Sequence, residues 1–259
     1  MFINKVSPSK IKVYDECKKK YKFKYIDYLR KNYNKNSNTD ALQFGSYVHR
    51  VFELGYNASS VEELQKIANE CRPNYDFPKA KESGMNKILR NFFRFNSNLH
   101  EHVSTELPFE VDMKDDYKLN GIIDRVIKGK SGKYLVIDYK TSRKPMTSAE
   151  LYKDPQLIMY AYAVSKMFNV SLDNVTVAHY YPHLDKLISI SYGRTQVSQF
   201  LRILENKIWE IRKKKKEEFI ASQNQYCNWC NFKELCPEFG GTEQMLEEAK
   251  EREKAEKQD

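Results

Sequence analysis

At one point of this sequence, an apolar run that is typical of a buried strand is followed directly by charged residues, which are normally unfavourable in such a strand. Residues 118–141, KLNGIIDRVIKGKSGKYLVIDYKT, are expected to form a β-hairpin, because two apolar runs flank a turn rich in Gly, Lys and Ser. Residues 135–137 put apolar side chains on both faces, as in a strand covered on both sides. The strand then continues into Asp138 and Lys140, whose charges are almost never buried unpaired.

Asp138 and Lys140 are predicted to share one face, because side chains alternate along a strand. With the turn centred on Ser131, Asp124 of the first strand lies opposite Asp138, and such cross-strand Cβ atoms are about 4.5–5.5 Å apart. Two carboxylates that close repel each other unless a divalent cation compensates their charge. The pattern predicts a metal site; the alternative is a structural ion pair between Asp138 and Lys140.

A helix predicted over residues 41–56, ALQFGSYVHRVFELGY, offers an imidazole. Gly45, His49 and Glu53 follow one another at a spacing of four and share one helix face. A glycine one turn before the histidine allows the helix to approach another element closely. Taken alone, His49 is better explained as a structural histidine than as a ligand.

A second helix begins at Asp154-Pro155, which fit the N-cap and the first helical position, and runs to about Phe168. Its first turns place Gln156 and Tyr160 on one face. By themselves, Gln156 fits a surface residue near a helix start and Tyr160 fits a core aromatic.

The segment 225–239, QYCNWCNFKELCPEF, carries a cysteine motif with C-x2-C-x5-C spacing, formed by Cys227, Cys230 and Cys236. Three thiols in so short a segment indicate a metal or cluster site, whose fourth ligand would be Cys17, Cys71 or a histidine. Such a set could hold Zn²⁺ or an iron–sulfur cluster. Because zinc ribbons usually bring two CxxC pairs and Pro237 follows the last cysteine, the pattern favours [4Fe–4S].

The composition excludes a disordered chain and a secreted disulfide framework. The 259 residues are 41% hydrophobic and 13% aromatic, and the five cysteines are an odd number. The net charge of +9 favours a polyanionic partner, most simply nucleic acid. Neither an apolar run of membrane-spanning length nor a signal-peptide core is present in the sequence, so we expect an intracellular, cytoplasmic protein without a membrane partner.

The remaining elements follow from periodicity and caps. The N-terminal helix interleaves tyrosines with lysines; we expect its tyrosines to be mostly core and keep its lysine face as a candidate nucleic-acid contact. Cys71 is expected to be an ordinary thiol. The predicted elements are a helix over 7–31, helical structure over 60–103, strands at 106–112, 174–181 and 186–191, a helix over 195–220, and a charged C-terminal tail, 242–259, that is frayed or disordered.

Five motifs stand in a fixed order along the chain: Gly45-x3-His49, Gly121-x2-Asp124, Asp138-x-Lys140, Gln156-x3-Tyr160 and the cysteine motif. This order resembles the RecB-like branch of the PD-(D/E)XK nuclease superfamily over about residues 7–239. It is most similar to the iron–sulfur members, namely the CRISPR-associated exonucleases of the Cas-four type and the AddB nuclease domain. In that family one cysteine lies near the N-terminus and three near the C-terminus, which Cys17 and the cysteine motif reproduce.

The resemblance implies an α/β fold with a restriction-endonuclease-like core, in which helices flank a mixed central β-sheet. It implies one domain over residues 1–241, with a nuclease core at about 41–220. Segments 7–31 and 225–239 would form an iron–sulfur clasp, and 242–259 would be a tail.

The resemblance also implies a Mn²⁺- or Mg²⁺-dependent DNA exonuclease acting on single-stranded DNA or DNA ends. The implied metal ligands are His49, Asp124, Asp138 and the backbone carbonyl of Tyr139, with Glu106 near the metal in a supporting position. Ile123 stands before Asp124 where the superfamily motif has Pro, and the carboxylate is retained.

The implied catalytic set is Asp124, Asp138, Lys140, Gln156 and Tyr160. Lys140 would orient or polarise the attacking water and stabilise the charge that develops on the phosphorus centre. Gln156 would position Lys140 or the substrate, and Tyr160 would support the wall of the site behind Gln156. The implied [4Fe–4S] ligands are Cys17, Cys227, Cys230 and Cys236. Two alternatives remain: an endonuclease or structure-specific nuclease of recombination or CRISPR spacer processing, and a non-catalytic nucleic-acid-binding iron–sulfur subunit.

Overall fold

The computed structural model describes residues 4–34, 39–99, 102–114 and 117–256 of the chain. The backbone forms two compact units. The sheet unit comprises Asp40–Glu205, and the terminal unit comprises Met1–Thr39 together with Asn206–Asp259. Both segments of the predicted clasp, 7–31 and 225–239, fall in the terminal unit, and the assignment of a single domain over 1–241 stays a prediction.

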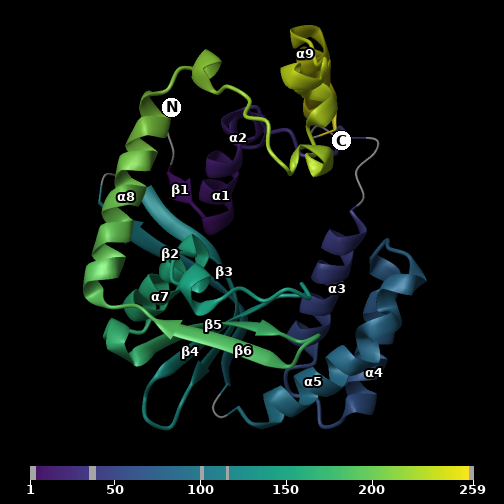
Figure 1. Ribbon diagram of the computed structural model, residues 1–259, viewed down its shortest axis with the longest axis vertical. Coiled ribbons are helices and arrows are strands. Elements are labelled where there is room, and N and C mark those ends of the chain that lie inside the picture. Colours follow the sequence, from purple (N-terminus) through teal and green to yellow (C-terminus); the bar gives the residue numbers. More distant parts are fainter. Residues whose placement is uncertain (1–3, 35–38, 100–101, 115–116, 257–259) are drawn as a thin grey trace. The chain divides into compact units, whose positions relative to one another are not determined.

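In the sheet unit, groups of helices and groups of strands follow one another along the chain (Figure 1). Its helices are α3 (Asp40–Leu54), α4 (Val61–Cys71), α5 (Met85–Ser97), α6 (Ser148–Leu151) and α7 (Pro155–Met167). Its strands are β2 (His102–Met113), β3 (Tyr117–Lys128), β4 (Tyr134–Tyr139), β5 (Val175–Tyr181) and β6 (Lys186–Ser191). Short 3₁₀ helices lie at Arg72–Asn74, Lys79–Gly84 and Leu172–Asn174, and α8 (Arg194–Lys213) begins in this unit and ends in the terminal unit.

The strands of the sheet unit pair in the order β2-β3-β4-β5-β6. All of these pairs are antiparallel except β4 with β5, which are parallel and connected through α7. Helices α3, α4 and α5 pack together against Ile137, Tyr139 and Tyr180 of the sheet, while α7 contacts β2, β3, β4 and β5. The predicted fold class, a mixed central sheet flanked by helices, is confirmed.

The predicted register of the hairpin is confirmed. Arg125 pairs with Ile137 and Lys128 pairs with Tyr134, which centres the turn on Ser131. Continuing this register by one residue puts Asp124 opposite Asp138. The pairing follows from the sequence because the two apolar runs fix which residues face the core, and a slip by one residue would expose them.

Other predicted elements shift at their ends. The strand predicted at 106–112 is longer, His102–Met113, so His102 and Val103 of the predicted helical region 60–103 belong to β2. Helices α4 and α5 lie in that region, separated by two short 3₁₀ helices. Residues 100 and 101 of that prediction lie outside the described residues. The helix predicted over 195–220 ends at Lys213, where a run of like charges disfavours further helical turns.

The terminal unit is built from short elements around the end of α8. They are β1 (Lys5–Val6), α1 (Pro8–Glu16), α2 (Lys18–Tyr25), α9 (Glu243–Ala255), and 3₁₀ helices at Lys216–Glu218, Cys227–Trp229, Lys233–Leu235 and Pro237–Phe239. Among the helices of the described segments, none is long and apolar enough to cross a bilayer.

The prediction of one continuous helix over 7–31 is wrong. The helix breaks at Cys17, whose backbone is extended (φ −164°, ψ 117°) and whose Sγ accepts a hydrogen bond from Lys20 N at 3.5 Å. The thiol therefore caps the start of α2 instead of continuing the turn of α1. Tyr14 and Tyr21 are buried, as expected, whereas Tyr28 is 62% exposed.

The expectation of a frayed or disordered C-terminal tail is also wrong. Thr242 caps α9 by accepting from Met245 N at 3.2 Å. Leu246 and Ala249 are buried against Phe23, Leu29, Phe232 and Leu235. Among its many charged residues the helix has a narrow apolar stripe, and this stripe packs against the apolar residues just named.

Candidate active site

A cleft of about 650 Å³ in the sheet unit gathers most of the predicted catalytic residues. It is lined by residues from α3, from β2, from the hairpin β3–β4 and from the start of α7. Predicted site residues in its wall are His49, Asp124, Asp138, Tyr139, Lys140 and Gln156, and Glu106 lies beside them. Tyr160 is not in the wall but is hydrogen-bonded to Gln156 behind it.

Helix α3 brings His49 to the end of β4. His49 Nε2 lies 2.9 Å from the carbonyl oxygen of Tyr139, and its Nδ1 lies 3.4 Å from Asp124 Oδ2. The same Asp124 oxygen accepts the backbone N–H of Tyr139 at 2.7 Å. A Cβ at Gly45 would stand 3.4 Å from Thr141 Oγ1, so the helix passes close to the chain after β4, as the glycine predicted.

His49, Glu106 and Asp124 form a group whose ligand atoms all lie within 4.8 Å of one another. The resemblance implies only a supporting position for Glu106, yet the structure places its carboxyl directly in the group. Its backbone has a φ of 45°, a left-handed conformation that is unusual for a residue other than glycine. Strained backbone of this kind is common at functional sites.

Asp138 lies beside this group and is paired with Lys140. The Lys140 ammonium is 2.6 Å from Asp138 Oδ2, and only 2% of Asp138 is exposed. Burial raises the pKa of Asp138, the nearby Asp124 raises it further, and the Lys140 ammonium lowers it. The alternative of a structural ion pair is therefore realised, but the pair forms part of the wall of the cleft.

A chain of hydrogen bonds holds Lys140 from the other side. Lys140 Nζ donates to Gln156 Oε1 at 3.3 Å, Gln156 Nε2 donates to Tyr160 OH at 2.8 Å, and Tyr160 OH donates to the carbonyl of Ile122 at 2.7 Å. Asp154 caps α7 by accepting from Gln156 N at 2.8 Å, which fixes the first turn of the helix. Burial lowers the pKa of Lys140, but the charge of Asp138 outweighs it and raises that pKa. Lys140 therefore remains a cation.

The electrostatic environment of His49 favours its protonated form. Burial opposes the imidazolium, but the hydrogen bond to Asp124 and the charges of Asp124 and Asp138 outweigh it and raise the pKa of His49 to about 9. The negative charges that stabilise the protonated His49 would also attract a metal cation.

The donor set fits a hard divalent cation. It offers two carboxylates, a third at Asp138, a backbone carbonyl and an imidazole, and oxygen ligands are those that Mg²⁺ prefers.

Sequence reasoning missed His179, a fully buried residue of β5 that pairs with Asp138 across the parallel strands. Its Nε2 lies 3.7 Å from Asp138 Oδ2 and 3.8 Å from Asp154 Oδ2, and its Nδ1 lies 3.3 Å from Tyr181 OH. The Tyr181 hydroxyl accepts from Met146 N at 3.0 Å, so its own proton is available for Nδ1. The Nε2–H of His179 then faces both carboxylates.

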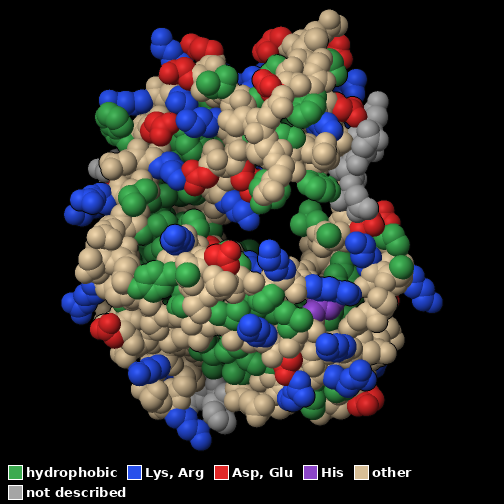
Figure 2. Space-filling view, viewed as in Figure 1, with side chains coloured by type: hydrophobic (Ala, Val, Ile, Leu, Met, Phe, Trp, Pro, Cys, Tyr) green, Lys and Arg blue, Asp and Glu red, His purple; other side chains and the backbone are tan. Residues whose placement is uncertain are grey.

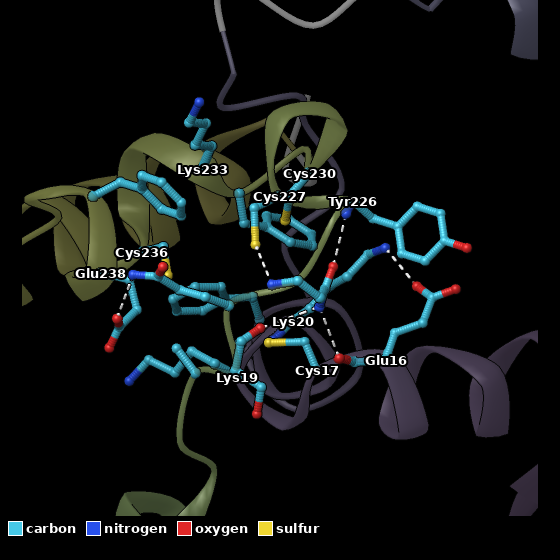
Figure 3. Close-up of a pocket in the computed structure, with 17 residues that line it drawn as sticks. Glu16, Cys17, Lys19, Lys20, Tyr226, Cys227, Cys230, Lys233, Cys236 and Glu238 are labelled. Carbon is cyan, nitrogen blue, oxygen red and sulfur yellow. Dashed lines mark hydrogen bonds and ion pairs between the residues drawn. The ribbon is translucent and has the colours of Figure 1, made fainter.

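The four cysteines of the predicted cluster line one pocket in the terminal unit (Figure 3). Cys17 comes from the break between α1 and α2, and Cys227, Cys230 and Cys236 come from the 3₁₀ turns before α9. All are free thiols, and burial raises the pKa of Cys230 and of Cys236. Cys71, an alternative fourth ligand, is buried in α4 of the sheet unit.

The four cysteines offer a soft, all-thiol donor set around one pocket. Such a set suits a zinc ion or an iron–sulfur cluster.

Known proteins resemble this chain in sequence and in fold. A model of the PD-(D/E)XK nuclease superfamily matches residues 5–237. An ATP-dependent helicase/deoxyribonuclease subunit of Streptococcus agalactiae is 26% identical over 179 residues, which is 62% of this chain and 16% of that protein. The protein of the same name from Streptococcus pyogenes is 23% identical over 222 residues, or 77% of this chain and 20% of that protein.

This chain thus matches only a fifth or less of the length of these curated relatives. A crystal structure from Eubacterium rectale, provisionally named an exonuclease, superposes with a TM-score of 0.55 at 15% identity and covers 86% of each chain. That likeness shows a shared fold. With the family match extending over most of the chain, the predicted resemblance is confirmed, and this protein belongs to the PD-(D/E)XK nuclease superfamily.

Proposed function

We propose that this chain is a metal-dependent deoxyribonuclease that hydrolyses phosphodiester bonds as an exonuclease on single-stranded DNA or DNA ends. The observation that carries the proposal is the convergence of His49, Glu106 and Asp124 with Asp138 and Lys140 in one cleft of a chain of this superfamily. The net charge of +9 adds support, because DNA is a polyanion.

His49, Asp124, Asp138 and the Tyr139 carbonyl would hold Mn²⁺ or Mg²⁺, and Glu106 is near enough to join them. When bound, the cation supplies Lewis-acid chemistry and a water of lowered pKa. Asp124 has a second task, because its Oδ2 also accepts the Tyr139 N–H and so fixes the carbonyl of the same peptide segment.

Lys140 would orient the attacking water and stabilise the negative charge that develops on the phosphate. Its ammonium is held between Asp138 and Gln156, so it is aimed before any substrate arrives. Gln156 and Tyr160 act through Lys140, because they connect it to the carbonyl of Ile122 on β3.

For the terminal unit we propose a [4Fe–4S] cluster on Cys17, Cys227, Cys230 and Cys236. The four free thiols around one pocket and the C-x2-C-x5-C motif followed by Pro237 support it. Such a cluster would join parts of the chain that are about 210 residues apart, a restriction of the unfolded chain that stabilises the folded one. We propose a structural rather than a redox role.

The decisive test is Asp138→Ala, assayed with Mn²⁺ on end-labelled single-stranded DNA. Loss of a buried metal ligand should lower the rate by about a thousandfold or more, because metal-ion charge stabilisation amounts to several kcal/mol. Asp76→Ala, which removes an exposed aspartate from the same unit, is the matched control and should remain active. Full activity of Asp138→Ala would refute the site assignment.

A further inference from the structure

A second pocket, of about 400 Å³, adjoins the catalytic cleft. It lies between the start of α3, the 3₁₀ helix Lys79–Gly84 and the chain that follows β4. The two hollows share Ala41, Thr141 and Ser142 in their walls, so they are continuous along one side. A ligand extending out of the cleft on this side would enter the second pocket.

The two pockets differ in charge. The cleft carries acidic side chains, Glu106, Asp124 and Asp138 among them, together with basic ones such as Arg50 and Lys140. The titratable side chains that line the second pocket are all basic: Lys81, Arg143 and His183. Within the described part of the chain, neither Lys81 nor Arg143 makes a side-chain hydrogen bond or ion pair. Figure 2 shows lysine and arginine side chains next to a histidine on one face of the molecule.

His183 is held in place by packing rather than by polar contacts. Its ring stacks on Phe44 at 6.2 Å between centroids, with the planes 30° apart. Its other side rests against Gly84, where a Cβ would stand 3.4 Å from Cε1 and 3.5 Å from Nδ1 of the ring. The imidazole therefore packs against both Phe44 and Gly84, and its ring nitrogens have no hydrogen-bond partner among the described residues.

The surroundings of the imidazole are positive as well as partly buried. Burial lowers the pKa of His183, and the nearby charges of Arg143 and Lys87 lower it further. These cations would attract a bound anion. Ser83 and Thr141 lie in the same wall, and their hydroxyl groups add donors suited to the several oxygens of a phosphate.

We propose that this pocket is a phosphate subsite, which binds a phosphate of the DNA strand whose scissile phosphodiester occupies the neighbouring cleft. The identity of the strand rests on the proposed function, while the preference for phosphate rests on the pocket itself. The carboxylates of the cleft repel a polyanion, so the basic pocket gives the strand a fixed anchor beside the reaction centre.

The test is binding of a labelled single-stranded oligonucleotide in EDTA, where hydrolysis cannot interfere. The double variant Lys81→Ala/Arg143→Ala removes two exposed, unpaired cations. Lys128→Ala/Lys130→Ala, at the end of β3 and in the turn that follows it, removes the same charge elsewhere in the sheet unit. We expect the first to weaken binding about tenfold and to lower the salt dependence by roughly one phosphate contact, and the second to change binding less than about twofold.

Equal weakening by the two double variants would overturn the proposal, because the effect would then be charge alone. Oligonucleotides with a 5′-phosphate, a 3′-phosphate or no terminal phosphate identify the source: selective loss for one of them assigns a terminal phosphate, and uniform loss assigns a backbone phosphate. Since the readout is binding, failure of the catalytic proposal in the Asp138→Ala assay would be recognised separately.

Discussion

At the scale of single residues, the site depends on side chains that act through others. His179 touches neither solvent nor the cleft, but its Nε2–H faces Asp138 and Asp154 at once. Burial and the Lys140 charge lower the pKa of His179, so it is a neutral donor. His179 thus lies between Asp138, the proposed metal ligand on β4, and Asp154, which caps α7 by accepting from Gln156 N.

We therefore expect His179→Gln to raise the Mn²⁺ concentration needed for half-maximal activity by about 10–100-fold, as loss of an outer-shell partner typically does. His102→Gln, which changes an exposed histidine of the same unit, is the control. The measurement is a Mn²⁺ titration at saturating DNA, well below the unfolding temperature. If the variant has an unchanged Mn²⁺ dependence and only a lower melting temperature, His179 contributes to the stability of the core and not to metal binding.

The proton on His49 provides a second test at this scale. Its pKa is about 9, raised from 6.5, so the imidazolium dominates at pH 8 and must lose its proton before it can coordinate. Mn²⁺ binding at pH 8 should release about one proton, and apparent affinity should rise about tenfold per pH unit until about pH 9. Calorimetry in buffers of different ionisation enthalpy measures the release. His49→Ala should abolish the release, and an unchanged proton count in that variant would contradict the assignment.

At the scale of elements, what the sequence could predict depends on how local the information is. The position of Asp124 opposite Asp138 can be predicted from the alternation of side chains along the strands and the centre of one turn. The position of Gln156 in the first turn of α7 can be predicted from the Asp154-Pro155 cap. His179 could not be found in this way, because its pairing with Asp138 requires knowing that β4 and β5 are parallel neighbours. The break at Cys17 escaped prediction because its flanking lysines and tyrosines favour an unbroken helix.

That break has a testable consequence. It places the Cys17 thiol at the pocket lined by Cys227, Cys230 and Cys236, so Cys17→Ala should prevent cluster assembly. Anaerobically purified protein should be brown, with about four irons per chain, and the variant should be colourless. Cys71→Ala, which alters a buried thiol of the sheet unit, should keep the colour. Iron and zinc analysis decides: stoichiometric zinc in the unaltered protein would refute the cluster.

At the scale of the whole molecule, charge and cleft together bear on the mode of attack. A net charge of +9 should make DNA binding strongly dependent on salt, whatever the sequence of the DNA. The cleft shares part of its wall with the proposed phosphate subsite, which would contact the DNA backbone. We therefore expect the protein to recognise the backbone and the ends of DNA rather than its bases.

We therefore expect Mn²⁺-dependent degradation of linear single-stranded DNA and little cleavage of the same sequence as a closed circle. Gel analysis of both substrates, labelled internally, measures the ratio, and Asp138→Ala is the control for contaminating nucleases. Because an exonuclease needs an end, the circle should survive until it is nicked. Equal rates on both forms would favour the endonuclease alternative while leaving the metal site intact, since the chemistry at His49, Asp124 and Lys140 is the same for an internal phosphodiester as for a terminal one.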